Sequence, residues 1–162
     1  TINRSVIEHL NLIHDSGVQF IWQTGKYYYQ KISDSMKGKE LPNLKVMDFI
    51  SDMGAAYKAA DLIISRAGAS SISEFQIIGK PVILIPSPNV AEDHQTKNAM
   101  ALVNKQAAIY VKDAEAPDTL LPLALKVIAD DSKLKSLSEN VKKMGLKNSA
   151  DIIADEVLKL IK

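Results

Sequence analysis

The chain has 162 residues and a mass of 17.8 kDa, the usual size of one domain, and 46% of its residues are hydrophobic, which suffices for an ordinary core. Its 20 Lys and Arg against 19 Asp and Glu leave a formal net charge of +1, which argues against broad electrostatic attraction to nucleic acid or to an anionic membrane. The sequence has no cysteine, which excludes disulfides and a cysteine nucleophile. No apolar run approaches the roughly 18 residues of a membrane span, so we expect neither a transmembrane segment nor a secretion signal.

Apolar residues recur at helical spacing and in short continuous runs, and the two patterns alternate along the chain. In chain order, the expected elements are a helix over 2–13, a strand over 18–22, a helix over 27–36, a strand over 44–49, a helix over 53–60, a strand over 62–64, a helix over 71–78, a strand over 81–85, a helix over 92–105, a strand over 108–111 and a helical tail from 118 onward. The chain opens at Thr1 directly into the first helix, so we expect it to begin inside a larger protein.

Apolar strands without polar alternation, separated by helices, are typical of a parallel sheet that helices cover on both faces. We therefore expect an α/β domain with a doubly wound parallel sheet, and five strands fit one such sheet. Ligands of these sheets bind beyond the carboxyl ends of the strands. The segments to inspect are therefore the strand-to-helix turns at 23–26, 49–53, 65–74 and 86–98.

One of these turns, which joins an apolar strand to a helix, consists of small residues apart from one arginine, with the sequence Ser65-Arg66-Ala67-Gly68-Ala69-Ser70-Ser71. Such a turn lets a phosphate approach the backbone, where the first amides of the helix point outward. The alternative is a structural turn in which Ser71 caps the helix and Glu74 completes a capping box. The two interpretations compete for Glu74, because a glutamate here can instead accept hydrogen bonds from ribose hydroxyls.

A polar run over 92–98 opens the next expected helix and places His94, Gln95 and Asn98 near one another on its surface. Carboxamide and imidazole side chains both donate and accept hydrogen bonds, which suits a sugar with many hydroxyls. The alternative is a solvated helix face that begins with a capping box between Asn89 and Glu92. The histidines and carboxylates show no spacing typical of a metal site, so we expect a metal-independent reaction.

Four motifs follow one another in the chain, namely Phe49-Ile50-x-Asp52-Met53-x-x-Ala56-Tyr57, Ser65-Arg66-Ala67-Gly68-Ala69-x-x-x-x-Glu74, Gly79-x-Pro81 and Asp93-His94-Gln95-x-x-Asn98-Ala99. Together these motifs closely resemble those of the MurG family. The resemblance runs in order and spacing from Thr1 to about Val111. Members of this family are GT-B glycosyltransferases that move N-acetylglucosamine from UDP-N-acetylglucosamine onto lipid-linked muramyl-pentapeptide, which converts lipid I to lipid II in peptidoglycan synthesis. The resemblance implies that residues 1–162 are one Rossmann-like donor-binding domain, the C-terminal half of a two-domain enzyme.

The same resemblance implies roles for individual residues. Phe49 and Ile50 match the uracil site, and Glu74 matches the acid that binds the ribose hydroxyls. The diphosphate and sugar positions correspond to Arg66, Gly68, Ser71, His94, Gln95 and Asn98. Gln23 and Gly25 resemble a loop at the edge of the cleft. At His94 this sequence departs from family members that have a second glutamine.

The resemblance also implies parts that these residues do not include. Family members place a strand and a Gly-Gly-Ser loop before the position of Thr1, and an N-terminal domain carries the acceptor site, the membrane-facing patch and the general base. We therefore expect no catalytic residue and no cofactor in this chain, a parent enzyme on the inner face of the bacterial plasma membrane, and a gap in the sheet that exposes strand edges. The alternatives are a stand-alone donor-binding subunit of a two-chain glycosyltransferase and a non-catalytic α/β module.

Overall fold

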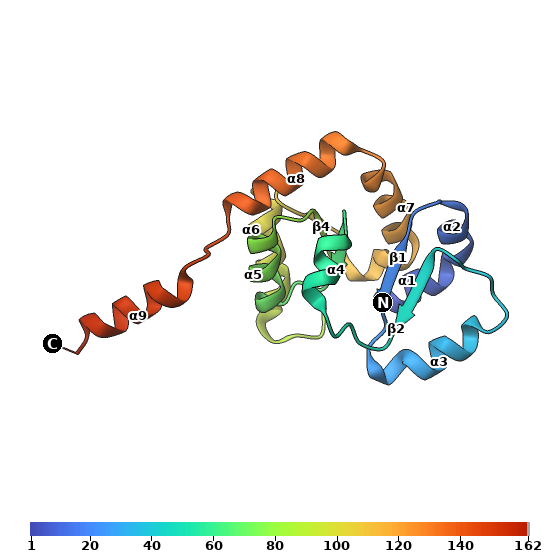
Figure 1. The fold of residues 1–162 in the computed structure, drawn as a ribbon, viewed down its shortest axis with the longest axis horizontal. Helices are drawn as coiled ribbons and strands as arrows, with labels where there is room; N and C mark the ends of the chain where they lie inside the picture. The colour runs from blue at the N-terminus through green and yellow to red at the C-terminus, as the bar shows by residue number, and fades with distance from the viewer. Residues whose placement is uncertain (162) are drawn as a thin grey trace.

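Five short strands form two separate parallel sheets in the computed structural model, which describes residues 1–161 (Figure 1). The strands are β1 (Phe20–Gln23), β2 (Leu44–Met47), β3 (Ile63–Ser65), β4 (Val82–Leu84) and β5 (Ile109–Tyr110). Strand β1 pairs with β2, and β4 lies between β3 and β5. The expected parallel α/β class is confirmed. The expectation of a single five-stranded sheet is wrong, because the β1–β2 pair and the β3–β4–β5 group are separate.

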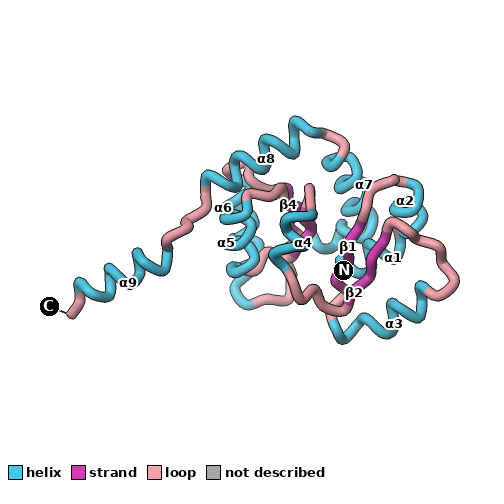
Figure 2. Tube along the Cα trace, in the orientation of Figure 1, coloured by secondary structure: helices cyan, strands magenta, loops and turns pink. Residues whose placement is uncertain are grey.

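Helices alternate with the strands as the sequence predicts (Figure 2). They are α1 (Ile2–Glu8), α2 (Leu10–Asp15), α3 (Lys26–Met36), α4 (Met53–Ala59), α5 (Ala69–Ile78), α6 (His94–Val103), α7 (Ala116–Ile128), α8 (Asp131–Lys143) and α9 (Ser149–Lys159), with 3₁₀ turns η1 (Ala91–Asp93) and η2 (Asp113–Glu115). The single helix expected over 2–13 is broken at His9. The His9 ring nitrogen Nδ1 hydrogen-bonds to the Ser5 carbonyl oxygen at 2.9 Å. The His9 backbone N–H donates to the Val6 carbonyl oxygen, three residues earlier, and so does not continue the α-helical pattern.

A groove separates the two sheets. Its volume is about 1330 Å³, and residues of β1 and β3 line it together with apolar side chains of α1 and α7. Each of these strands is paired with a neighbour in its own sheet, so the second edge of each borders the groove. The interruption between β1 and β3 agrees with the gap in the sheet, and the exposed strand edges, that the family resemblance implies.

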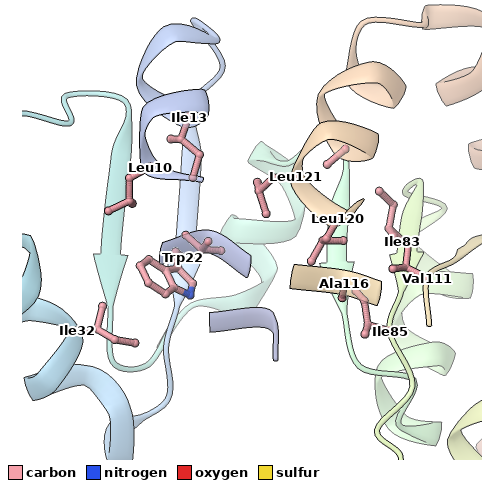
Figure 3. Packing of buried hydrophobic residues seen from close by; sticks show 12 residues of the cluster. Leu10, Ile13, Trp22, Ile32, Ile83, Ile85, Val111, Ala116, Leu120 and Leu121 are labelled. Carbon is pink, nitrogen blue, oxygen red and sulfur yellow. The ribbon is translucent and has the colours of Figure 1, made fainter. Parts of the chain in front are cut away.

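Apolar side chains on both sides of the groove form the core. Trp22 is 5% exposed, and its indole N–H donates to Asn3 Oδ1 at 3.0 Å, which ties β1 to α1. Figure 3 shows Leu120 and Leu121 of α7 between the β1 side and the side that holds Ile83 of β4. The strand β4 is completely buried, which explains why its sequence is an unbroken apolar run.

Helix α9 extends away from the rest of the domain, at the red end of the ribbon in Figure 1. Its apolar residues Ile153, Val157 and Leu158 are more than half exposed. Within residues 1–161, no helix combines the length and the apolar character that crossing a membrane requires.

Candidate functional site

The turn between β3 and α5 opens into a helix that begins at Ala69. Gly68 occupies the N-cap position with extended backbone angles, so Ser71 lies inside the first turn. The capping box between Ser71 and Glu74 is therefore a wrong interpretation. Glycine has no side chain with which to accept a hydrogen bond, so the first amides of α5 are open to an anionic group.

The Glu74 carboxylate hydrogen-bonds to helix α4 and not to its own main chain. The Tyr57 hydroxyl donates to Glu74 Oε2 at 2.7 Å. The Tyr57 ring meets the buried Phe75 ring edge to face, with 5.9 Å between the centroids. Burial, and then the bond to Glu74 and its charge, raise the pKa of Tyr57 to about 12. Tyr57 belongs to the first of the four sequence motifs, but its contact with Glu74 was not predicted from the sequence.

The Arg66 guanidinium is tied to the ends of two other strands. Its Nη1 donates to the carbonyl oxygens of Ile85 at 3.1 Å and Pro86 at 3.2 Å, just beyond β4. The same nitrogen donates to the carboxylate of Asp113, which opens η2 after β5. Burial acts to raise the pKa of Asp113, but hydrogen bonds from Arg66 and Thr1 outweigh it and hold that pKa below its usual value. The positive charge of Arg66 is therefore already paired with Asp113.

The start of α6 lies against the same turn. Asn98 Nδ2 donates to the Ala67 carbonyl at 3.2 Å, which joins α6 to the β3–α5 turn. Gln95 Oε1 accepts from the Ser87 backbone N–H at 2.9 Å and so holds the loop after β4. The exposed His94 turns its Nδ1 to the Ala91 carbonyl at 2.8 Å. The structure thus joins Gln95 and Asn98 to adjacent turns, whereas His94 contacts its own loop.

The helix expected to begin at Glu92 begins instead at His94. Glu92 and Asp93 have positive φ angles of 54° and 51°, which places them outside the right-handed helical region. Asp93 is the N-cap of α6, so the capping box between Asn89 and Glu92 is also wrong.

The turns after β1 and β2 meet at the other sheet. The Ile50 backbone N–H donates to Gln23 Oε1 at 2.8 Å. Phe49 is 56% exposed, and Lys26 Nζ lies 5.9 Å from the centroid of its ring. The parallel register pairs Gln23 with Met47, which brings the residues after both strands to one edge. That register brings Ile50, three residues after Met47, within reach of the Gln23 side chain.

The groove between the sheets reaches only part of the candidate set. Gln23, Ile50, Tyr57 and Arg66 line it. The other candidate residues lie outside its lining, on the surface formed by the turns, namely Phe49, Gly68, Ser71, Glu74, His94, Gln95 and Asn98. Among the described residues, no group of three or more histidine, aspartate and glutamate side chains is placed to hold a metal ion.

Parallel sheets whose candidate residues gather in the turns after the strands define an α/β domain of the kind that binds ligands at that edge. Comparison with known families then identifies it: the glycosyltransferase family 28 C-terminal domain matches residues 1–153, and the chain belongs to this family.

Curated relatives and solved structures agree with this membership. The chain is 64% identical to the UDP-N-acetylglucosamine–N-acetylmuramyl-(pentapeptide) pyrophosphoryl-undecaprenol N-acetylglucosamine transferase of Bacteroides fragilis, over 99% of this chain and 43% of the relative. The protein of the same name from Bacteroides thetaiotaomicron is 62% identical, over 99% of this chain and 44% of the relative. The chain therefore spans less than half the length of these relatives.

The crystal structure of Acinetobacter baumannii MurG matches 97% of this chain and 44% of its own, with a TM-score of 0.77 and 25% identity. A glycosyltransferase of kitacinnamycin shares the fold, with a TM-score of 0.67 at 20% identity over 93% of this chain and 38% of its own. The resemblance to the C-terminal half of the MurG family is confirmed.

Proposed function

We propose that this chain is the UDP-N-acetylglucosamine-binding domain of an inverting glycosyltransferase. The longer protein then adds N-acetylglucosamine to lipid-linked muramyl-pentapeptide, in the step from lipid I to lipid II. The names of relatives that are 64% and 62% identical over 99% of this chain support the assignment. The proposed domain covers residues 1–162, of which Lys162 lies outside the described residues.

The observation that carries the proposal is the open start of helix α5 beside the Glu74 carboxylate. The first amides of this ten-residue helix follow a glycine N-cap, and the positive end of a helix favours a phosphate. Glu74 lies about one turn further along the same helix, and a carboxylate can accept hydrogen bonds from two adjacent hydroxyls. Because phosphate and ribose are neighbouring parts of a nucleotide, the α5 amides and the Glu74 carboxylate can bind the same ligand.

In this proposal the two sheets hold different ends of the donor. Phe49 and Ile50 hold uracil, whose carbonyl and N–H edge offers the same groups as a carboxamide. Since Gln23 already accepts from the Ile50 N–H, uracil takes the place of that side chain. The donor sugar then lies toward Gln95 and Asn98, and His94 joins them after turning away from Ala91.

Transfer of the sugar displaces UDP from the anomeric carbon and builds negative charge on the leaving diphosphate. The amides at the start of α5, with Gly68 and Ser71 beside them, stabilise that charge. Arg66 contributes only by exchanging Asp113 for the diphosphate. A hydroxyl of the muramyl sugar attacks from the opposite face, and a base outside this chain takes its proton. We place this enzyme at the inner face of the bacterial plasma membrane, where its lipid-linked acceptor lies.

Titration of UDP and UDP-N-acetylglucosamine into the labelled chain, followed by amide NMR, tests the proposal. We expect saturable shifts at Gly68, Glu74 and Gln95. Glu74→Ala should weaken the binding of UDP by about 1–3 kcal/mol, because the hydrogen bonds to the ribose are lost. The exposed Glu139 on α8 provides a control, and Glu139→Ala should leave the affinity unchanged. A non-catalytic module predicts no saturable shifts, and equal affinities of wild type and Glu74→Ala would remove Glu74 from the site.

A further inference from the structure

We propose that Tyr57 is a positioning residue, which holds the Glu74 carboxylate in the orientation that accepts hydrogen bonds from ribose hydroxyls. The inference rests on the proposed function and adds to it a residue on a different helix. Tyr57 belongs to α4, Glu74 to α5, and their side chains meet at 2.7 Å. The bond therefore links the ribose position to the helix that follows the proposed uracil site.

The Tyr57 ring is well placed to hold a neighbour still. One end packs edge to face on Phe75, which is 1% exposed and packs in the core with Ile72 and Leu102. The other end carries the hydroxyl to the surface, where Glu74 is exposed. A tyrosine used in this way has an apolar body fixed in the core and a polar tip at a defined place.

Glu74 needs such a partner because its side chain is long and solvent-exposed. A free glutamate samples many rotamers, and a ligand that requires one of them must bear the cost of ordering it. The Tyr57 hydroxyl occupies Oε2, and within residues 1–161 no donor reaches Oε1. The carboxylate is therefore oriented before the ligand arrives and retains an oxygen for the ribose, which raises affinity by preorganisation.

If the hydrogen bond between Tyr57 and Glu74 only held α4 against α5, its loss would not affect recognition of the ribose. Two nucleotides, one with and one without ribose hydroxyls, distinguish this structural role from a positioning role. The test measures dissociation constants of the full chain for UDP and for 2′,3′-dideoxy-UDP, which lacks both ribose hydroxyls, by isothermal titration calorimetry. Tyr57→Phe removes the hydroxyl and keeps the ring on Phe75. Tyr29 on α3 is also half-buried, so Tyr29→Phe is a matched control.

We expect Tyr57→Phe to lower the affinity for UDP about three- to tenfold and to leave the affinity for the dideoxy analogue unchanged. Tyr29→Phe should alter neither affinity. In a Glu74→Gln background, Tyr57→Phe should cause no further loss, because Tyr57 acts through the carboxylate. Thermal unfolding followed by circular dichroism verifies that each variant is folded.

Two results overturn the inference alone: an equal loss for both nucleotides, or unchanged UDP affinity in Tyr57→Phe when Glu74→Ala still weakens binding. If the wild-type chain fails to bind UDP, the proposed function falls, and the inference falls with it.

Discussion

Arg66 and Asp113 form an ion pair that joins the turn after β3 to the segment after β5. The same guanidinium nitrogen reaches the carbonyl oxygens of Ile85 and Pro86, so one side chain connects the carboxyl ends of three strands. In a sheet whose strands have only two or three residues, such ties fix the relative positions of the turns. Arg66 thus has a structural role that precedes any contact with a diphosphate.

Replacing Arg66 by alanine should lower the free energy of unfolding by about 1–3 kcal/mol, because Asp113 and two carbonyl oxygens lose their donor. Urea denaturation measures the change. Arg4→Ala is the matched control, since Arg4 and Glu8 form an exposed pair on α1, with the Arg4 side chain 69% exposed. An exposed helical pair contributes little to stability, because solvent screens its charges. Equal effects of the two substitutions would show that the Arg66 network adds no more to stability than an exposed ion pair does.

Asp113 should make the chain sensitive to acid. Its pKa is lowered in the folded state, so its contribution to stability is present above the pKa of the unfolded chain and is lost as pH falls through the folded value. Asp113→Asn should therefore destabilise the chain at pH 7 and have progressively less effect as pH falls below about 4. Urea denaturation of both proteins at pH 7 and pH 3 measures the difference. A difference that stays constant with pH would contradict the assignment.

The order of helices and strands could be predicted from the sequence because apolar periodicity reports burial directly. Buried β4 is an unbroken apolar run, and the heavily covered α7 carries a clear apolar stripe. The break at His9 could not be predicted, because the apolar spacing continues across it. The kink before α6 depends on positive φ angles at Glu92 and Asp93, and neither residue type requires that conformation.

The candidate site was predictable as a set of turns but not as a set of contacts. Rules for parallel sheets place residues 65–74 and 86–98 at one edge. They do not say that Glu74 bonds Tyr57, seventeen positions away, or that Arg66 bonds Asp113, forty-seven positions away. Such contacts depend on how α4 and η2 pack, which local sequence does not determine. The capping-box alternatives, which used local spacing alone, were wrong for this reason.

Gln23 should compete with uracil for the Ile50 N–H, which its side-chain oxygen occupies at 2.8 Å. If UDP must displace this contact, Gln23→Ala should raise the affinity for UDP about two- to tenfold, the worth of one hydrogen bond. Calorimetric titration of UDP measures the change. Gln30→Ala serves as the control, because Gln30 bonds Asp34 on the exposed face of α3. Weaker UDP binding by Gln23→Ala would mean that Gln23 supports the loop and is not displaced.

A strand supplied to the groove between β1 and β3 should stabilise the domain. Both strands present an edge to this groove, and its apolar lining includes Leu120 and Leu121. We expect that about five Val and Ile residues, fused ahead of Thr1 through a linker of about four residues, fill this space as a central parallel strand. Thr1 itself borders the groove, so the linker can reach it. The two sheets then become one, and the edges are no longer exposed.

The fused strand should raise the midpoint of thermal unfolding by at least about 5 °C, since roughly 2 kcal/mol corresponds to several degrees in a domain of this size. An extension of equal length with two prolines is the control, because proline cannot donate to a sheet and is excluded from central strands. Calorimetry gives the two midpoints. Equal midpoints for the two extensions would mean that the groove accepts apolar chain without strand pairing.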